Sequence, residues 1–304
     1  MHAVGAAGNE RKIMRVFRTT FLLVALTLLL MLLGQYLGVR TGLGGSTGMT
    51  IGLGFAIFSN AFAYFFSDKI ALLSSGAKPV TREQLPRLYA VMERLAAKAN
   101  LPVPKLYVVP EAAPNAFATG RNPRHASVAV TQGLLELMND DELEGVIAHE
   151  LSHVRNYDIL ISSIAATIAG AITWIAYWGP WLGYGDRDDR EGGGGGGILG
   201  LLMMILAPLA AMLLQLALSR QREYSADATG AGMVGNPYGL ISALQKLGAY
   251  NNRIPTTAIS PSTSSLCIVK PLFGRRSLGT LFSTHPALAD RIAALREMTI
   301  IPQR

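Results

Sequence analysis

Cysteine and charge are both scarce in this sequence of 304 residues. The single cysteine, Cys267, excludes an intrachain disulfide, and nothing else points to an oxidising compartment. Charged residues make up 15% of the chain and hydrophobic residues 50%, which is too apolar for an ordinary soluble domain. The formal charge of +7 comes without a basic run interleaved with aromatics. We therefore expect lysine and arginine beside a membrane and no nucleic-acid partner.

Four uncharged apolar stretches predict four transmembrane helices, because each is about long enough to cross a bilayer. The first follows a basic N-terminus and resembles a signal peptide. It is long for one, however, and no small-residue cleavage site follows it, so we interpret it as a retained span. The third and fourth stretches either span the bilayer or form a re-entrant hairpin. The stretches cover residues 21–37, 44–66, 159–183 and 198–218.

Glycines at positions 44, 48 and 52 recur at four-residue spacing in the second stretch. They would expose backbone on one helix face, which suits close helix packing in lipid. The alternative interpretation is that glycine is tolerated there without such a role, and the sequence favours neither.

The spans divide one soluble domain into two parts. Basic residues flank the first, second and fourth spans, and the loop after the third is net acidic, so both termini and the soluble domain are predicted to be cytoplasmic. The predicted segments are a basic N-terminus (1–18), two transmembrane helices (19–66), a first domain part (67–157), the third and fourth spans with an acidic glycine-rich loop at 185–197 (158–218), and a second domain part (219–304).

Local patterns predict helices packed against a small β-sheet in this domain. Two capping-box pairs predict helix starts: Thr81 with Gln84, opening a helix to about Asn100, and Asn139 with Glu142. Strands are predicted at 105–109 and 127–131, with a loop or edge segment at 114–120. The predicted fold class is therefore a mainly α membrane protein with four transmembrane helices and a cytoplasmic α+β domain that contains a small β-sheet.

A metal-binding motif lies on the helix that the second pair opens. His149-Glu150-Leu151-Ser152-His153 matches H-E-x-x-H, whose two histidines lie one turn apart on a helix and can share one zinc ion. Glu150 stands beside them as a general base for water that zinc makes more acidic. Two histidines buried in a core are the alternative interpretation. It is weakened because an apolar stripe lies on a different helix face: Leu143, Ile147, Leu151 and Val154.

A catalytic zinc needs a third protein ligand and one open position. Glu223 and Asp227 lie four residues apart in a run rich in small residues. Glu223 could bind zinc and Asp227 could orient a ligand histidine, although a solvated pair of acids on a surface helix is the simpler alternative. Two predicted spans separate His153 from Glu223, so both return to the same compartment. Their short distances to these spans place the zinc on the order of 10 Å from the membrane, which favours membrane-associated substrates.

Together, four ordered motifs resemble the HtpX-type membrane zinc metalloproteases, relatives of the CAAX prenyl-protein proteases. These motifs are P-N-A-F-A-T-G (114–120), H-E-L-S-H (149–153), S-R-Q-R-E-Y-S-A-D (219–227) and T-H-P-A-L-A-D-R-I (284–292). The glycine tract at 192–197 departs from that pattern and is interpreted as a linker.

The resemblance implies an endopeptidase of the bacterial inner membrane that clears misfolded or damaged membrane proteins in protein quality control and stress response. It implies a zincin-like metallopeptidase domain with one zinc per chain held by His149, His153 and Glu223, and with Glu150 as general base. Asn115, with Ala116 and Phe117, is implied to hold the substrate backbone, and His285 to stabilise the oxyanion. From the residues alone, Asn115 could be only a turn residue and His285 only part of a helix start.

Three alternatives to this function remain. A CAAX-type prenyl-protein peptidase is less favoured because four spans are few for that group. A non-catalytic scaffold stabilised by zinc has no need of Glu150. A metal transporter would carry ionisable residues inside its spans, where this sequence has almost none. Cleavage specificity, natural substrates, regulatory partners and oligomeric state do not follow from the sequence.

Overall fold

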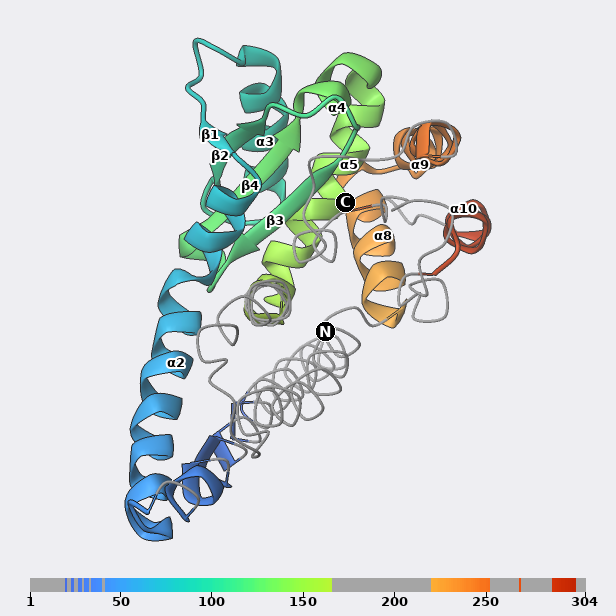
Figure 1. Cartoon of the computed structure of the whole chain (residues 1–304). Helices are drawn as coiled ribbons and strands as arrows, with labels where there is room; N and C mark the ends of the chain where they lie inside the picture. Colours follow the sequence, from blue (N-terminus) through green and yellow to red (C-terminus); the bar gives the residue numbers. More distant parts are fainter. Residues whose placement is uncertain are drawn as a thin grey trace, which may run out of the picture. The chain divides into compact units, whose positions relative to one another are not determined.

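The computed structural model describes residues 42–165, 220–251, 268 and 286–298, together with parts of 20–39. The chain divides into two compact units, Met1–Ser67 and Asp68–Arg304. The described part is mainly helical and contains one small mixed β-sheet (Figure 1).

A long apolar helix, α2 (Gly45–Ser74), covers the second predicted span and continues eight residues beyond it. Among the described residues it is the one helix long and apolar enough to cross a membrane. Its 30 residues correspond to about 45 Å. Large apolar side chains such as Phe55, Ile57 and Phe58 are exposed along it, as expected of a lipid-facing surface. The described residues of the first predicted span are also helical.

Glycines bring this helix into backbone contact with the preceding helical segment. A Cβ added at Gly48 would lie 2.1 Å from the Gly34 carbonyl oxygen, and one at Gly52 would lie 2.4 Å from that of Leu30. Close packing is therefore the correct interpretation for Gly48 and Gly52. Gly44 differs, because it lies before the helix with a φ of +86° and serves the turn.

The β-sheet belongs to the second unit and has the strand order β1-β2-β4-β3 among the described residues. β2 runs parallel to β4, whereas β1 and β3 pair antiparallel with β2 and β4, respectively. The strands at 105–109 and 127–131 are confirmed, and the segment predicted as a loop or edge is the edge strand β3. The strands are β1 (Lys78–Pro79), β2 (Lys105–Val109), β3 (Ala116–Gly120) and β4 (Ala126–Thr131).

Helix α3 (Pro86–Lys98) begins four residues later than the Thr81–Gln84 pair predicted. The Gln84 side chain does accept the Thr81 N–H, at 2.9 Å. This hydrogen bond closes a turn, however, and does not start a helix. Proline is favoured in the first helical turn, and it disfavours helical backbone in the residue before it. Leu85 is accordingly non-helical, with φ −135° and ψ 66°. The local rule was right about the hydrogen bond and wrong about the helix start.

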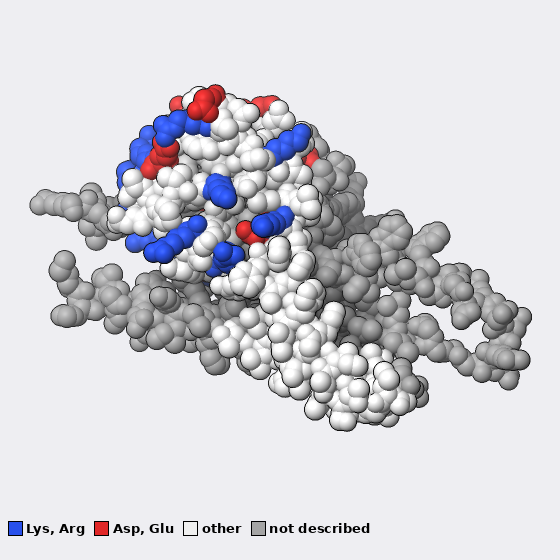
Figure 2. Space-filling model, turned by 90° about the vertical axis from the view of Figure 1, so that its left-hand side faces the viewer, with Lys and Arg blue, Asp and Glu red and all other residues white. Residues whose placement is uncertain are grey.

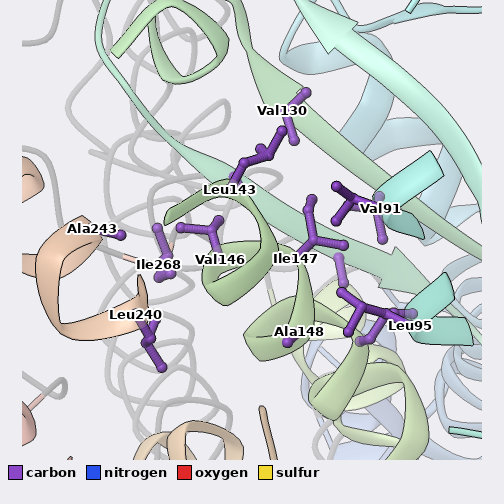
Figure 3. Close-up of a cluster of buried hydrophobic side chains, with 14 of the residues drawn as sticks. Val91, Leu95, Val130, Leu143, Val146, Ile147, Ala148, Leu240, Ala243 and Ile268 are labelled. Atoms are coloured by element: carbon purple, nitrogen blue, oxygen red, sulfur yellow. The ribbon is translucent and has the colours of Figure 1, made fainter. Parts of the chain in front are cut away.

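Helix α5 (Asp140–Arg155) is central to the second unit and carries both motif histidines. The predicted capping box is confirmed: the Asn139 side chain accepts the Glu142 N–H, and the Glu142 carboxylate accepts the Asn139 N–H, both at 2.9 Å. The predicted apolar stripe is fully buried. Figure 3 shows residues of α5 between side chains of α3 and β4 on one side and of α9 on the other.

The second unit also contains the short helix α4 (Gln132–Leu137), between β4 and α5, and three later helices: α8 (Arg220–Val234), α9 (Tyr238–Asn251) and α10 (Leu288–Glu297). α8 and α9 pack on α5, and α10 packs on α8 and α9. Glycines allow the closest approaches. A Cβ at Gly145 of α5 would lie 2.5 Å from the Leu240 nitrogen, and one at Gly239 would lie 2.2 Å from the Asp141 carbonyl oxygen. The backbones of α5 and α9 are therefore in direct contact.

Charged side chains gather on part of the described surface in Figure 2, and other described parts in this view are uncharged. The part of α2 in the first unit, residues 45–67, contains no charged residue. Residues 166–183 of the third predicted span, the whole fourth span, the acidic loop and the glycine tract lie outside the described residues.

Candidate metal centre

Helix α5 points its two motif histidines toward each other. Their Nε2 atoms lie 3.2 Å apart, because a spacing of four places them one turn apart on one face. His149 is almost fully buried, whereas 17% of the His153 side chain is exposed. The pair is therefore reachable from solvent through His153.

Helix α8 supplies a carboxylate to the same point. The Glu223 oxygens lie 3.7 Å from His149 Nε2 and 3.8 Å from His153 Nε2. Gly230, two turns later, brings α8 against α5: a Cβ there would lie 2.9 Å from the His149 nitrogen. The small residues noted in the sequence thus permit the predicted close approach, and the alternative of a solvated surface pair is excluded because Glu223 and Asp227 are both buried.

These three side chains fit a zinc ion. Their candidate ligand atoms all lie within 4.8 Å of one another. Tetrahedral zinc with bonds of about 2.0–2.1 Å separates its ligands by about 3.3 Å, so the observed 3.2–3.8 Å requires little rearrangement. Two imidazoles and one carboxylate are also a common donor set for catalytic zinc, which keeps its fourth position open.

A buried ion pair fixes the orientation of His149. Its Nδ1 lies 2.8 Å from an Asp227 oxygen, which leaves Nε2 for the metal. Arg291 of α10 donates two hydrogen bonds to Asp227, at 2.6 and 2.8 Å, and a third to the Ile268 carbonyl, at 2.9 Å. Burial alone would raise the pKa of Asp227, but the Arg291 charge and these hydrogen bonds outweigh it and lower that pKa. Asp227 therefore stays ionised at neutral pH.

The ring of His153 also has a carboxylate partner. Asp158 Oδ2 lies 3.3 Å from His153 Nδ1. Burial works to lower the pKa of His153, but the hydrogen bond with Asp158 and the nearby charge of Glu223 raise it to about 9. Without metal, the proton on this ring is therefore strongly held by the surrounding carboxylates.

Glu150 is buried beside the histidines and is 2% exposed. Burial raises its pKa above the ordinary value, and the charge of Glu223 acts in the same direction. The two histidines and a hydrogen bond from the Ala118 backbone oppose this shift without cancelling it. A carboxyl group with a raised pKa is suited to taking up and releasing a proton near neutral pH.

Edge strand β3 brings the predicted substrate segment near this centre. Asn115 is buried, and its side-chain oxygen accepts the Ala116 N–H at 2.9 Å. The Ala116 carbonyl accepts the Ile268 N–H at 3.2 Å. Phe117 points its side chain into a separate cluster with Leu72, Val109 and Ala129, so it contributes backbone alone to this edge. His285 lies outside the described residues.

Sequence reasoning missed Asp158 and Arg291 as contributors to the centre. Arg291 lies in the C-terminal motif T-H-P-A-L-A-D-R-I. The one feature that could have indicated its role is that it is a basic residue on the apolar side of a short helix. Asp158 gave no signal, because its contact with His153 depends on how the chain turns after α5.

Comparisons with known proteins agree with this geometry. The family model described as peptidase family M48 matches residues 82–299. A protein named "Protease HtpX homolog" from Desulfatibacillum aliphaticivorans is 52% identical over 282 residues, covering 91% of this chain and 88% of that protein. A protein of the same name from Syntrophobacter fumaroxidans is 50% identical over 285 residues, covering 93% and 99%.

Among solved structures, the crystal structure of S. mikatae Ste24p matches with a TM-score of 0.49 and 19% identity, over 94% of this chain and 66% of that one. The family match covers well over half of the sequence and includes the three candidate metal ligands. The chain therefore belongs to peptidase family M48 and is an HtpX-type metallopeptidase.

Proposed function

We propose that this chain is a zinc endopeptidase in which His149, His153 and Glu223 bind one zinc ion and Glu150 is the general base. The observation that carries the proposal is the grouping of three buried or half-buried ligand side chains within 4.8 Å, with a buried carboxyl of raised pKa beside them. A purely structural zinc site usually has four protein ligands and no need of such an acid. The scaffold alternative is therefore disfavoured.

The division of labour among the side chains follows from their contacts. Zinc bound here would polarise the scissile carbonyl and make water more acidic. Glu150 would accept a proton from the attacking water and deliver it to the leaving amine. Asp227 holds His149 so that Nε2 faces the ligand group. His285 is proposed to stabilise the oxyanion, on the basis of the family resemblance.

The outer edge of β3 is the proposed place for the substrate backbone. The Asn115 carbonyl pairs inward with β4 through Thr131, so in an antiparallel strand the groups of Ala116 and Ala118 face outward. The Ala116 carbonyl accepts the Ile268 N–H, so this edge is accessible to a main-chain donor. Asn115, Ala116 and Phe117 would then position an extended peptide through main-chain pairing.

Substrates are proposed to be misfolded or damaged membrane proteins, cleaved near the cytoplasmic surface of the bacterial inner membrane. The apolar helix α2 supports membrane attachment, and the charge pattern supports a cytoplasmic domain and cytoplasmic termini. We also propose that the chain has four transmembrane spans, with the segment boundaries predicted from the sequence. A prenyl-protein peptidase is the second candidate, and cleavage of a prenylated peptide separates the two.

The decisive variant is Glu150→Gln, assayed in the full chain in detergent with an unfolded polypeptide as substrate. We expect zinc to remain bound and cleavage to fall by a factor of at least 10². Glu136→Gln is the matched control, because Glu136 is an exposed glutamate on a neighbouring helix. Undiminished cleavage by Glu150→Gln would refute the mechanism.

The membrane part of the proposal needs its own comparison. One cleavable segment is presented either close to a transmembrane anchor or as a free soluble peptide, with the enzyme in lipid vesicles. We expect faster cleavage of the anchored form. Equal rates would contradict the proposed preference for membrane-associated chains and leave the zinc chemistry standing.

A further inference from the structure

A buried carboxylate directly after α5 contacts the second histidine of the metal group. Asp158 is 3% exposed, and its Oδ2 lies 3.3 Å from His153 Nδ1. This contact parallels that of Asp227 with His149, at 2.8 Å. The two carboxylates come from different parts of the chain, and each faces the ring nitrogen that does not point at the other histidine.

The chain must leave the helix for this contact to form. In a continuous α-helix, a residue five positions after His153 would be rotated about 140° away from it around the axis. Here α5 ends at Arg155, and Tyr157 adopts a φ of +60°. This left-handed backbone is unfavourable for a bulky residue, and such conformations persist where the surrounding structure enforces them. The turn at Tyr157 changes the course of the chain after α5 and places Asp158 beside His153.

A second contact holds the segment that follows α5 in place. Residues 158–165 are helical, and the buried Ser163 hydroxyl lies 2.7 Å from the Thr119 hydroxyl. Ser163 also accepts the Gly120 N–H, at 3.4 Å. Thr119 and Gly120 end strand β3, the strand whose Ala118 backbone is hydrogen-bonded to Glu150. Asp158 is thus anchored by protein contacts that do not involve the metal ligands.

We infer that Asp158 is a positioning residue: its carboxylate accepts the Nδ1–H of His153 and fixes the ring so that Nε2 faces the metal position. The inference rests on the proposed zinc-peptidase function and extends it to the second histidine. A carboxylate partner selects the tautomer with a free Nε2, holds the ring orientation and makes the nitrogen a stronger ligand. His153 needs this more than His149 does, because it is the more exposed of the two.

The test measures zinc affinity of the full chain in detergent, by competition with a chelator, for Asp158→Ala and Asp158→Asn. Loss of an outer partner of a ligand histidine typically weakens metal binding 10- to 100-fold, and we expect that loss for Asp158→Ala. Asp158→Asn should lose less, because its amide oxygen still accepts the hydrogen bond without the charge. Asp227→Asn serves as a positive reference, and Asp141→Asn, at an exposed aspartate of α5, as the matched control.

Melting of the metal-free protein separates positioning from a structural role. Weaker zinc binding with an unchanged metal-free Tm supports the inference. Zinc affinity within twofold of the parent in both variants overturns it, and so does a lower metal-free Tm with unchanged affinity, since Asp158 would then only hold the turn. Both overturning results leave the parent binding zinc, so they are distinguishable from failure of the proposed function, in which the parent itself binds none.

Discussion

The contact between α8 and α5 at Gly230 controls how Glu223, the proposed third ligand, meets the histidines. In Gly230→Ala, the added methyl would lie 2.9 Å from the His149 nitrogen and 3.0 Å from the Ala148 carbonyl carbon. Both neighbours are backbone atoms, so no side chain can rotate away. Ordinary contact begins near 3.4 Å, so α8 must move by about 0.5 Å. Glu223 and Asp227 lie on that helix and must move with it.

The expected cost is that of overpacking, about 1–3 kcal/mol, which corresponds to a fall in Tm of about 2–12 °C for a domain of this size. We also expect zinc affinity to fall about tenfold or more, because the carboxylate withdraws from two histidines that stay on α5. Thermal melting of the metal-free protein and competition with a chelator measure the two effects separately.

Gly232→Ala is the matched control on the same helix, since a Cβ there meets nothing within 4 Å. Alanine favours helix over glycine by about 1 kcal/mol, so this variant should be slightly more stable and should bind zinc normally. If Gly230→Ala also kept parental stability and affinity, the close α5–α8 approach would not be what positions Glu223.

Three further changes test other contacts. Glu142→Gln should cost about 1.5–3 kcal/mol at pH 7, because the carboxylate accepts a hydrogen bond from Lys246 at 2.8 Å. Burial works to raise the pKa of Glu142, but its hydrogen bonds lower it below the ordinary 4.5, so its contribution is present above that value and is lost as the pH falls through the folded-state pKa. Denaturant titrations at pH 7 and at a pH below the folded-state pKa should therefore show that parent and variant differ less in unfolding free energy in acid. An equal difference at the two pH values would contradict this. Gly48→Leu should lower the melting temperature in detergent, because its Cβ would lie 2.1 Å from the Gly34 oxygen; a parental Tm would count against that helix contact. Arg291→Met should destabilise by about 3–5 kcal/mol, since it leaves a buried carboxylate without its cation; denaturation of the variant measures this, and a change below 1 kcal/mol would refute it.

The features that sequence predicted best are those set by neighbouring residues. The capping box at Asn139 and Glu142 fixes the start of α5, and the four-residue spacing then fixes the relation of His149 to His153. The failure at Thr81 is also local: the capping rule competes with Pro86, and proline prevails because it restricts the backbone of the residue before it. The two-residue strand β1 carries too little pattern to be recognised.

Contacts between distant segments were predictable only where small residues marked them. The small residues around Glu223 correctly indicated that α8 approaches α5 closely. The contacts of Arg291 and Asp158 gave no comparable signal. In the sequence, a charged residue that becomes buried in an ion pair or after a turn looks the same as a charged residue on the surface. Their positions depend on how α10 packs and on the left-handed backbone of Tyr157, which no local pattern required.

The central claim is that His149, His153 and Glu223 together hold one zinc ion. Its most direct test is the zinc content per chain of the purified protein, compared with that of Glu223→Ala after equal dialysis against a weak chelator. We predict one zinc per chain in the parent and little or none in the variant. Equal zinc content in both would contradict the claim, because Glu223 could not then be the third ligand.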